Sequence, residues 1–200
     1  MAGSDTLDDY REKRDFSRTP EPPGERDAAA AHPIFVIQKH DATTLHYDFR
    51  LEVDGVLKSW AVPKGPSPDP KEKRLAIPTE DHPLDYADFE GVIPAGSYGA
   101  GTVLVWDRGT YRNLTQKGGR EVGAAEALGR GHISVWLEGE KVRGGYALTR
   151  FRTGKSEAWL LVKKDDAEAD PGRDPVATEP RSVVSGRTLA QVAAGSKHLR

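Results

Sequence analysis

The chain has 200 residues, of which 36% are hydrophobic, enough for one domain with a substantial core. Its formal net charge of −2 gives no overall attraction to nucleic acid, so any polyanion binding must come from a local cluster of Arg and Lys. The absence of cysteine excludes disulfides, thiolate metal sites and a cysteine nucleophile. No run approaches the roughly 18 apolar residues that span a bilayer, so we expect a cytoplasmic protein without membrane contact.

Composition divides the chain into three segments. Residues 1–32 are rich in charged residues, Pro, Gly and Ala, which predicts a mostly extended arm with a short helix around residues 7–16. Residues 33–165 have the pattern of a β domain. Residues 166–200 are rich in Asp, Pro, Arg and Ser, which predicts a flexible tail or linker.

Short apolar or alternating runs in the central segment predict β-strands. These runs are Ile34–Gln38, Leu45–Val53, Val56–Val62, Arg74–Ile77, Thr102–Trp106, His132–Leu137, Lys141–Arg150 and Ala158–Val162. Asp54-Gly55 predicts a two-residue hairpin, Glu138-Gly139 is a weaker hairpin signal, and the glycines of Gly96–Gly101 predict a tight bend. One weak helix is predicted near residues 120–128. The pattern is typical of a barrel or sandwich, and we expect a mostly β fold, a compact antiparallel β-barrel with short helices.

The run that begins at Leu45 carries the most informative pattern. Its apolar positions Leu45, Tyr47, Phe49 and Leu51 alternate with the polar positions His46, Asp48, Arg50 and Glu52. Because a strand has a period of two, we expect the apolar set to face the core and the polar set to line the opposite surface. Two metal-type ligands and a guanidinium then share one face.

A turn at residues 41–44 would bring His40 back over this face, beside His46 and Asp48. Two imidazoles and a carboxylate suit Mn²⁺, Fe²⁺ or Zn²⁺ and leave coordination positions for water or substrate. The planar guanidinium of Arg50 matches two phosphate oxygens. This combination predicts a site that processes a phosphate ester.

Further charged residues follow this strand. They are Lys64, Arg74, Glu80 and His82. Each taken alone is more often an ordinary surface or loop residue. Together with the strand face they supply what hydrolysis of a phosphate ester requires: a metal, cations that neutralise developing charge, and an imidazole that acts as an acid or as a phosphate ligand.

The central segment resembles a known family. The stretches QKHDATTLHYDFRLEVDGVLKSWAVPKGPS and RLAIPTEDHPLDYADFEGVIPAGSYGAGTVLVWDRG, continuing through GHISVWLEGEKVRGGYALTR and EAWLLVKK, are similar to the 3′-phosphoesterase module of bacterial ATP-dependent DNA ligase D. The arm joins the resemblance through Tyr10–Phe16 and Thr19–Glu21, which implies that it folds back onto the barrel.

The resemblance implies roles for individual residues. It implies a Mn²⁺ site, with Zn²⁺ or Co²⁺ as alternatives, formed by His40, His46 and Asp48. It places Arg50 and His82 on the scissile phosphate. It adds further contributors to the active site: Lys64, Arg74 and Glu80 from the domain, and Arg14, Asp15 and Glu21 from the arm.

The resemblance also implies a reaction in two steps. A phosphodiesterase step removes a terminal ribonucleotide and leaves a 3′-phosphate, and a phosphomonoesterase step then exposes a 3′-hydroxyl. The implied substrates are 3′ ends of DNA or of RNA/DNA primer-templates, and the implied partners are a ligase or polymerase and an end-binding protein of bacterial end joining. We expect a monomer associated with the nucleoid.

Two alternatives belong to other functional classes. In the first, His46, Asp48 and His132 form the facial triad of an Fe(II) oxygenase, and Arg143 binds an oxoacid. In the second, the chain binds DNA ends without cleaving them. Its stacking platforms would then be tryptophans, of which Trp60 is the best candidate because the other three occupy apolar strand contexts.

Overall fold

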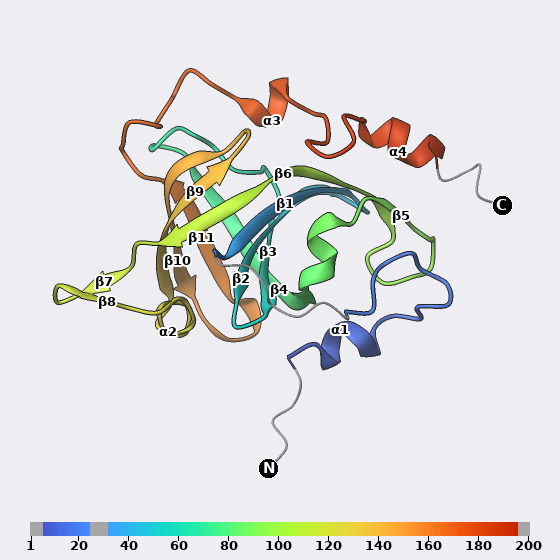
Figure 1. The fold of residues 1–200 in the computed structure, drawn as a ribbon, viewed down its shortest axis with the longest axis horizontal. Helices are drawn as coiled ribbons and strands as arrows, with labels where there is room; N and C mark the ends of the chain where they lie inside the picture. Colours follow the sequence, from blue (N-terminus) through green and yellow to red (C-terminus); the bar gives the residue numbers. More distant parts are fainter. Residues whose placement is uncertain (1–5, 25–31, 196–200) are drawn as a thin grey trace, which may run out of the picture.

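The fold is that of a computed structural model, which describes residues 6–24 and 32–195. Eight antiparallel strands form a closed barrel (Figure 1). In spatial order they are β1 (Ile34–Asp41), β2 (Leu45–Val53), β3 (Val56–Val62), β4 (Lys73–Pro83), β11 (Ala158–Lys163), β10 (Arg143–Arg152), β9 (His132–Gly139) and β6 (Gly101–Asn113). Pairing of β6 with β1 closes the barrel, and β5 (Gly91–Ile93) adds to one end of β6. The predicted antiparallel barrel is confirmed.

The remaining elements are short. They are α1 (Asp8–Glu12), the 3-10 helix η1 (Leu84–Asp88), β7 (Gln116–Lys117), β8 (Arg120–Glu121), α2 (Ala124–Gly129), the 3-10 helix η2 (Gly154–Ser156), α3 (Pro175–Thr178) and α4 (Leu189–Gly195). Within residues 6–24 and 32–195, no helix is both long enough and apolar enough to cross a membrane.

Local sequence explains the strand boundaries. Asp54 and Gly55 both have positive φ (51° and 82°), as a tight two-residue hairpin requires, and β2 and β3 have the predicted bounds. By contrast, β4 and β6 extend well beyond the predicted runs. In β6 the polar residues after Trp106 break the alternating pattern, yet Gly109 lets the strand continue because a Cβ there would lie 2.0 Å from the carbonyl oxygen of Glu138.

Alternate residues of β1 contribute to two separate hydrophobic clusters, and β2 contributes to one of them. Phe35, Ile37 and Phe49 belong to the large cluster that fills the barrel. Val36 belongs to a second cluster with Tyr10 of α1 and with residues of η1, which cover the other face. The face predicted to be an open surface is therefore largely enclosed. Leu45, predicted to face the core, is 42% exposed because it is the first residue after the β1–β2 turn.

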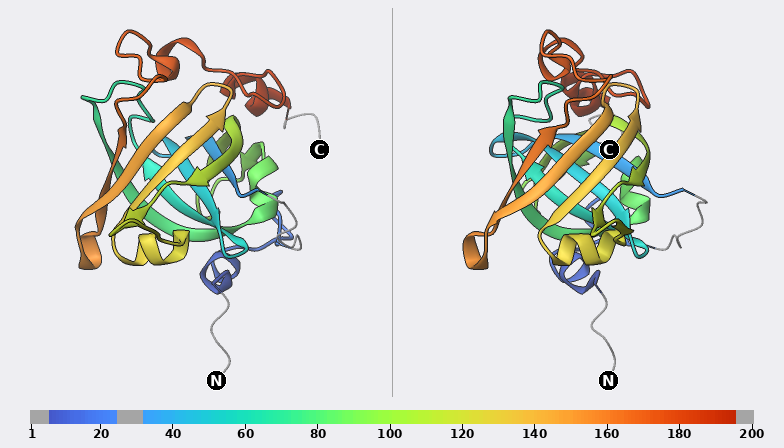
Figure 2. Two further views of the ribbon diagram at one scale, coloured as in Figure 1. Left: turned by 60° about the vertical axis from the view of Figure 1, so that its left-hand side comes forward. Right: turned by 90° about the vertical axis from the view of Figure 1, so that its left-hand side faces the viewer.

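The C-terminal segment packs across one end of the barrel, as Figures 1 and 2 show. Lys141 Nζ donates to the carbonyls of Glu179 and Arg181, and Trp106 Nε1 donates to that of Glu179 over 2.8 Å. Val192 of α4 is 2% exposed within the main hydrophobic cluster. Residues 166–195 thus differ from the flexible tail that composition predicted, because scattered apolar side chains dock on the barrel without forming a periodic pattern.

Candidate active site

The candidate site lies on the enclosed outer face of β1 and β2. The two strands are antiparallel, with His40 opposite His46, Gln38 opposite Asp48 and Val36 opposite Arg50. Directly opposed residues of neighbouring strands lie side by side on one face, so the pairing brings both histidines next to Asp48. The register alone therefore assembles the predicted metal ligands.

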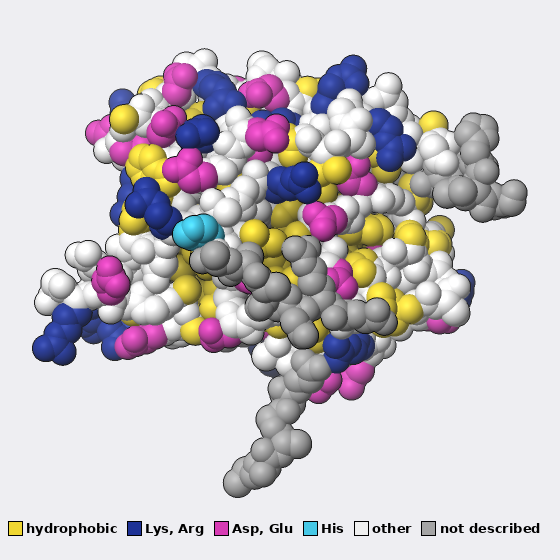
Figure 3. Space-filling model, viewed as in Figure 1, with side chains coloured by type: hydrophobic (Ala, Val, Ile, Leu, Met, Phe, Trp, Pro, Cys, Tyr) yellow, Lys and Arg dark blue, Asp and Glu magenta, His cyan; other side chains and the backbone are white. Residues whose placement is uncertain are grey.

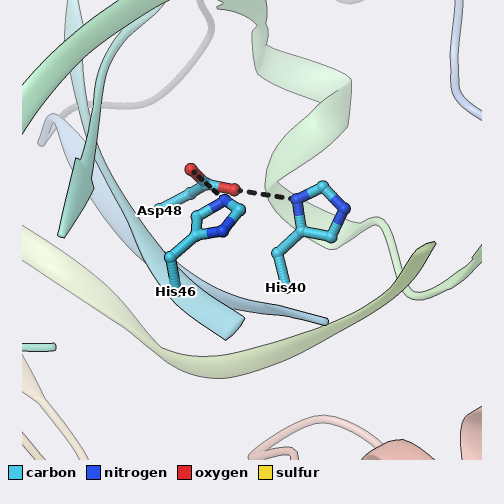
Figure 4. Close-up of side chains that lie close together, drawn as sticks. All are labelled: His40, His46 and Asp48. Carbon is cyan, nitrogen blue, oxygen red and sulfur yellow. Dashed lines mark ion pairs between the residues drawn. The ribbon is translucent and has the colours of Figure 1, made fainter. Parts of the chain in front are cut away.

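Figure 4 shows the side chains of His40, His46 and Asp48 converging. His40 Nδ1 lies 3.5 Å from one carboxylate oxygen of Asp48, and His46 Nε2 lies 3.3 Å from the other. One ligand atom from each residue lies within 4.8 Å of the others. Two nitrogens and one oxygen at this spacing form a donor set for a divalent cation.

Backbone carbonyls orient both imidazoles. His40 Nε2 lies 2.8 Å from the carbonyl oxygen of Gly99, and His46 Nδ1 lies 2.9 Å from that of Thr44. Since a carbonyl accepts, these nitrogens donate, and the other nitrogen of each ring lies toward Asp48. Outer hydrogen bonds of this kind are typical of histidines that ligate metals.

Electrostatics favour a cation among these three groups. Burial raises the pKa of Asp48, but the charge of Arg50 and hydrogen bonds from the two imidazoles outweigh burial, and the net pKa lies well below the ordinary value. Burial lowers the pKa of His46, yet Asp48 and the Thr44 carbonyl bring its net pKa above the ordinary value. The carboxylate is thus ionised and attracts positive charge, so the residues fit a bound divalent metal.

Arg50 is 3% exposed and is held from three sides. Its Nε donates to Gln38 Oε1 over 2.8 Å, its Nη1 lies 3.1 Å from His82 Nδ1, and its Nη2 forms an ion pair with Asp48 over 3.3 Å. These contacts leave about two of the five guanidinium N–H groups for another ligand. A fixed guanidinium beside a metal site is suited to binding phosphate.

His82 lies on β4 and is 5% exposed. Burial, together with the charges of Arg50 and Arg14, lowers the pKa of His82 well below its ordinary value, so the ring is neutral. His82 Nδ1 lies 2.9 Å from the carbonyl oxygen of Glu80 and 3.1 Å from the Arg50 guanidinium. Nδ1 carries the ring proton when it donates to the Glu80 carbonyl, and Nε2 carries it when Nδ1 accepts from the guanidinium.

The N-terminal arm contributes Arg14, whose side chain is 4% exposed. Its guanidinium donates to Glu21 over 2.9 Å and to Glu80 over 2.6 Å, which ties the arm to β4. Glu21 also accepts from Thr19 Oγ1 over 2.8 Å and from the Tyr86 hydroxyl over 3.0 Å. The structure therefore places Arg14, Glu21 and Glu80 in one network beside the candidate metal centre.

These residues surround a cavity of about 280 Å³. Seven of the eleven predicted site residues line it: Arg14, His40, His46, Asp48, Arg50, Glu80 and His82. Glu21 does not line the cavity, but it contacts Arg14, which does. In contrast, Figure 3 shows a face on which Lys and Arg mix with Asp and Glu, as expected for a chain of small net charge. The cavity lining contains two arginines, Arg14 and Arg50, together with Asp48 and Glu80.

Besides Glu21, three predicted residues lie outside the cavity lining. Asp15 is exposed and accepts from Ser17 within a turn. Lys64 is exposed in the turn after β3, and Arg74 on β4 is 3.7 Å from Glu72. Their roles at the site stay predictions that rest on the family resemblance.

The structure does not place the key residues of the two alternative functions as those functions require. His132 begins β9 and contacts Thr149 Oγ1 (2.8 Å) and Ser134 Oγ (3.2 Å), away from the group formed by His46 and Asp48. The predicted facial triad is therefore not assembled. Trp60 is only 4% exposed, so its proposed role as a stacking platform was wrong.

Gln38 and Tyr86 are among the site residues that sequence reasoning missed. Gln38 is fully buried and donates to the carbonyls of Tyr86 (2.6 Å) and Phe89 (3.2 Å) while it accepts from Arg50. Its position two residues before His40, on the same face of β1, was an available signal. Tyr86 lies on η1, where no strand periodicity applied.

Comparison with known proteins agrees with this geometry. Residues 38–150 match the family described as the DNA Ligase D 3′-phosphoesterase domain. The chain is 51% identical over 194 residues to the multifunctional non-homologous end joining protein LigD of Pseudomonas aeruginosa, covering 94% of this chain and 22% of that protein. It is 49% identical over 164 residues to the corresponding DNA repair protein LigD of Mycobacterium tuberculosis, covering 82% and 21% respectively.

A third relative, from Mycolicibacterium smegmatis, is 46% identical over 170 residues, which cover 84% of this chain and 22% of that protein. The chain thus spans about a fifth of the length of the curated relatives it matches. The match includes every predicted metal ligand and the cavity residues of β1 to β4. On this evidence the chain belongs to the DNA ligase D 3′-phosphoesterase domain family.

Proposed function

We propose that this chain is a metal-dependent phosphoesterase that processes 3′ ends of nucleic acid. It would remove terminal ribonucleotides and 3′-phosphates and leave 3′-hydroxyl ends for end joining. The observation that carries the proposal is the placement of an N,N,O donor set, a buried guanidinium and a neutral imidazole around one cavity. The names of the relatives, which describe non-homologous end joining, support the same substrate class.

His40, His46 and Asp48 would hold the metal through His40 Nδ1, His46 Nε2 and a carboxylate oxygen. We propose Mn²⁺, and Zn²⁺ or Co²⁺ suit the same donors. When bound, such a cation polarises the phosphate ester and offsets its negative charge. The chain contributes orientation, because the carbonyls of Gly99 and Thr44 fix which nitrogen of each ring is available.

Arg50 would bind the non-bridging oxygens of the phosphate. Its contacts with Gln38, His82 and Asp48 hold the guanidinium before substrate arrives, so little side-chain entropy is lost on binding. Because Arg50 recognises the phosphate and not the leaving group, one site suits both steps. In the first step the phosphorus–oxygen bond to the terminal ribonucleoside breaks. In the second, the bond to the remaining 3′ oxygen breaks, and water supplies the new oxygen each time.

His82 would donate a proton or a hydrogen bond to the phosphate or to the departing oxygen. A neutral ring with its proton on Nε2 is suited to this role, and the low pKa of His82 keeps it neutral at physiological pH. Arg14, held by Glu21 and Glu80, would add a second positive charge at the cavity. We further propose roles for Asp15, Lys64 and Arg74 in contacts with the nucleic acid, based on the family resemblance.

The proposed substrates are DNA or RNA/DNA primer-template 3′ ends, handled by a monomer. A ligase or polymerase would use the product end, and an end-binding protein would supply the substrate. Since phosphate contacts release counterions, binding of ends is expected to weaken as salt rises. The proposed location is the nucleoid, where such ends arise.

The test uses two labelled primer-templates, one with a 3′-phosphate and one with a single 3′-ribonucleotide, with and without Mn²⁺. Wild-type protein should convert both to primers that a polymerase can extend, and only when metal is present. Arg50→Ala should reduce the rate by at least about 100-fold, as expected for removal of a buried donor to developing charge. Arg112→Ala, a change on β6 outside the cavity, should act like wild type. Unchanged primers at high wild-type concentration would refute the proposed function.

A further inference from the structure

Tyr98 lies at the mouth of the cavity, on the loop between β5 and β6. Its side chain is 50% exposed although it lines the same cavity as the metal ligands. Among the described residues that line the cavity, only Tyr98 and Thr79 are exposed. Tyr98 therefore offers the aromatic surface that a molecule entering the cavity meets first.

The loop that carries Tyr98 is fixed next to the candidate metal centre. The carbonyl of Gly99, the following residue, accepts from His40 Nε2 over 2.8 Å. Within the loop, Ser97 N donates to the carbonyl of Pro94 and Ala100 N donates to that of Ser97, each over 3.1 Å. The position of the Tyr98 ring relative to the metal ligands is thus set by hydrogen bonds in the loop.

Two cations of the arm lie against the Tyr98 ring. Lys13 Nζ is 5.0 Å and Arg14 Cζ is 5.4 Å from the ring centroid, within the range of cation–π contacts. Both cations are themselves held by Glu80, each through a 2.6 Å contact. The ring is therefore supported from the arm as well as from its own loop, and half of its surface stays open to solvent.

The proposed substrate has a base that must lie near this mouth. If the 3′-phosphate lies between Arg50 and the metal ligands, the attached nucleoside extends toward the exposed rim of the cavity. Every base has a π-face, and stacking on an aromatic side chain is a recurrent way in which proteins bind unpaired or terminal nucleotides. Half-exposed Tyr98 has the shape and position for such a contact.

We infer that Tyr98 stacks on the base of the nucleoside whose 3′ oxygen bears the scissile phosphate. The inference rests on the proposed function and adds a specificity-determining residue to it. Stacking of this kind tolerates any of the bases, so Tyr98 would distinguish a nucleoside phosphate from other phosphate esters without selecting a sequence.

The test compares two 3′-phosphate primer-templates that differ only in whether the terminal nucleoside has a base or is abasic. With the base present, Tyr98→Ala should raise KM about 5- to 150-fold and change kcat by less than about twofold. Tyr98→Phe should behave like wild type, because it keeps the ring. Phe151→Ala, which removes an aromatic side chain that is 54% exposed on β10, is the matched control and should have no effect.

On the abasic substrate, wild type and Tyr98→Ala should have KM values within about twofold of each other. An unchanged KM for Tyr98→Ala on the base-containing end would overturn the inference, and so would an equal loss on the abasic end. Mn²⁺ affinity should be the same in both proteins. A weaker affinity in Tyr98→Ala would show that the residue acts through His40 and would also overturn it. Wild type inactive on both ends would instead refute the proposed function.

Discussion

Arg50 on β2 and His82 on β4 meet on the site face, with 3.1 Å between Arg50 Nη1 and His82 Nδ1. The two strands are not neighbours, since β3 lies between them. The residue of β3 opposite Arg50 is Ser59, which is small and buried, and the register of β3 with β4 shifts next to it. The small side chain and the bulge allow the Arg50 guanidinium and the His82 imidazole to share one cavity.

His82 makes the stability of the folded chain depend on pH. Burial and the charges of Arg50 and Arg14 lower the pKa of His82 in the folded state, whereas an unfolded histidine takes up a proton near pH 6.5. Because the unfolded state then binds more protons, the free energy of unfolding should fall as pH drops from 7.5 to 5.5. The slope from one such group is at most about 1.4 kcal/mol per pH unit.

Urea unfolding with EDTA present, at these two pH values, checks this dependence. His82→Asn removes the titrating group, so its free energy of unfolding should fall less than that of wild type. His46, whose raised pKa acts in the opposite direction, is present in both proteins and cancels in the comparison. If the free energy of unfolding fell equally in wild type and variant, the conclusion that His82 is buried and neutral would be contradicted.

Gln38 should be required for the stability of the site. Gln38→Leu keeps the approximate volume but leaves Arg50 Nε and the carbonyls of Tyr86 and Phe89 without their present partner. The expected loss is about 2–4 kcal/mol in the free energy of unfolding, measured by urea denaturation. Gln116→Leu, on the exposed hairpin β7–β8, should change it by less than about 0.5 kcal/mol. A similar small effect for both variants would show that the network around Gln38 contributes little.

Arg14 should hold the arm on the barrel. Arg14→Ala leaves the carboxylates of Glu21 and Glu80 without this shared cation, and loss of one partner from a buried pair typically costs about 3 kcal/mol. We expect lower stability, faster proteolysis within the arm and reduced end processing. Arg18→Ala, which removes an exposed arginine of the same arm, is the control. Indistinguishable proteolysis of the two variants would mean that the arm is held by other contacts.

The C-terminal segment should behave as part of the folded domain. Val192→Asp places a charge in the main hydrophobic cluster and should lower the free energy of unfolding by at least about 2 kcal/mol. Val184→Asp, at a site 45% exposed in the same segment, should have little effect. The free energies of unfolding of both variants are measured by thermal or urea denaturation. Equal stability would indicate that α4 does not dock on the barrel in solution.

Strand periodicity predicted the parts of the fold in which one face is apolar and the other polar. The bounds of β2 and β3 and the hairpin at Asp54-Gly55 follow from local pattern and turn chemistry. The length of β6 could not be predicted from local pattern. The strand continues through Gly109 because its neighbour β9, which is distant in the sequence, brings the Glu138 carbonyl too close for a side chain. Docking of Val192 likewise depends on a tertiary surface that no local pattern describes.

For the site, alternation along β2 predicted that His46, Asp48 and Arg50 share a face, and the register with β1 added His40. Residues that reach the cavity from irregular segments were harder to predict. Arg14 and Glu21 were found through the family resemblance, since the composition of the arm indicated only an extended chain. Tyr86 was missed because its role depends on how η1 packs over the strands.

The central claim is that His40, His46 and Asp48 bind a catalytic divalent metal. Electron spin-echo spectroscopy of the chain loaded with Mn²⁺ tests it directly, because the method detects ligating imidazole nitrogens. We predict one Mn²⁺ per chain, with coupling to two imidazoles in wild type and in His132→Ala and to one in His46→Ala. A Mn²⁺ signal without nitrogen coupling in wild type, or a coupling lost in His132→Ala, would contradict the account.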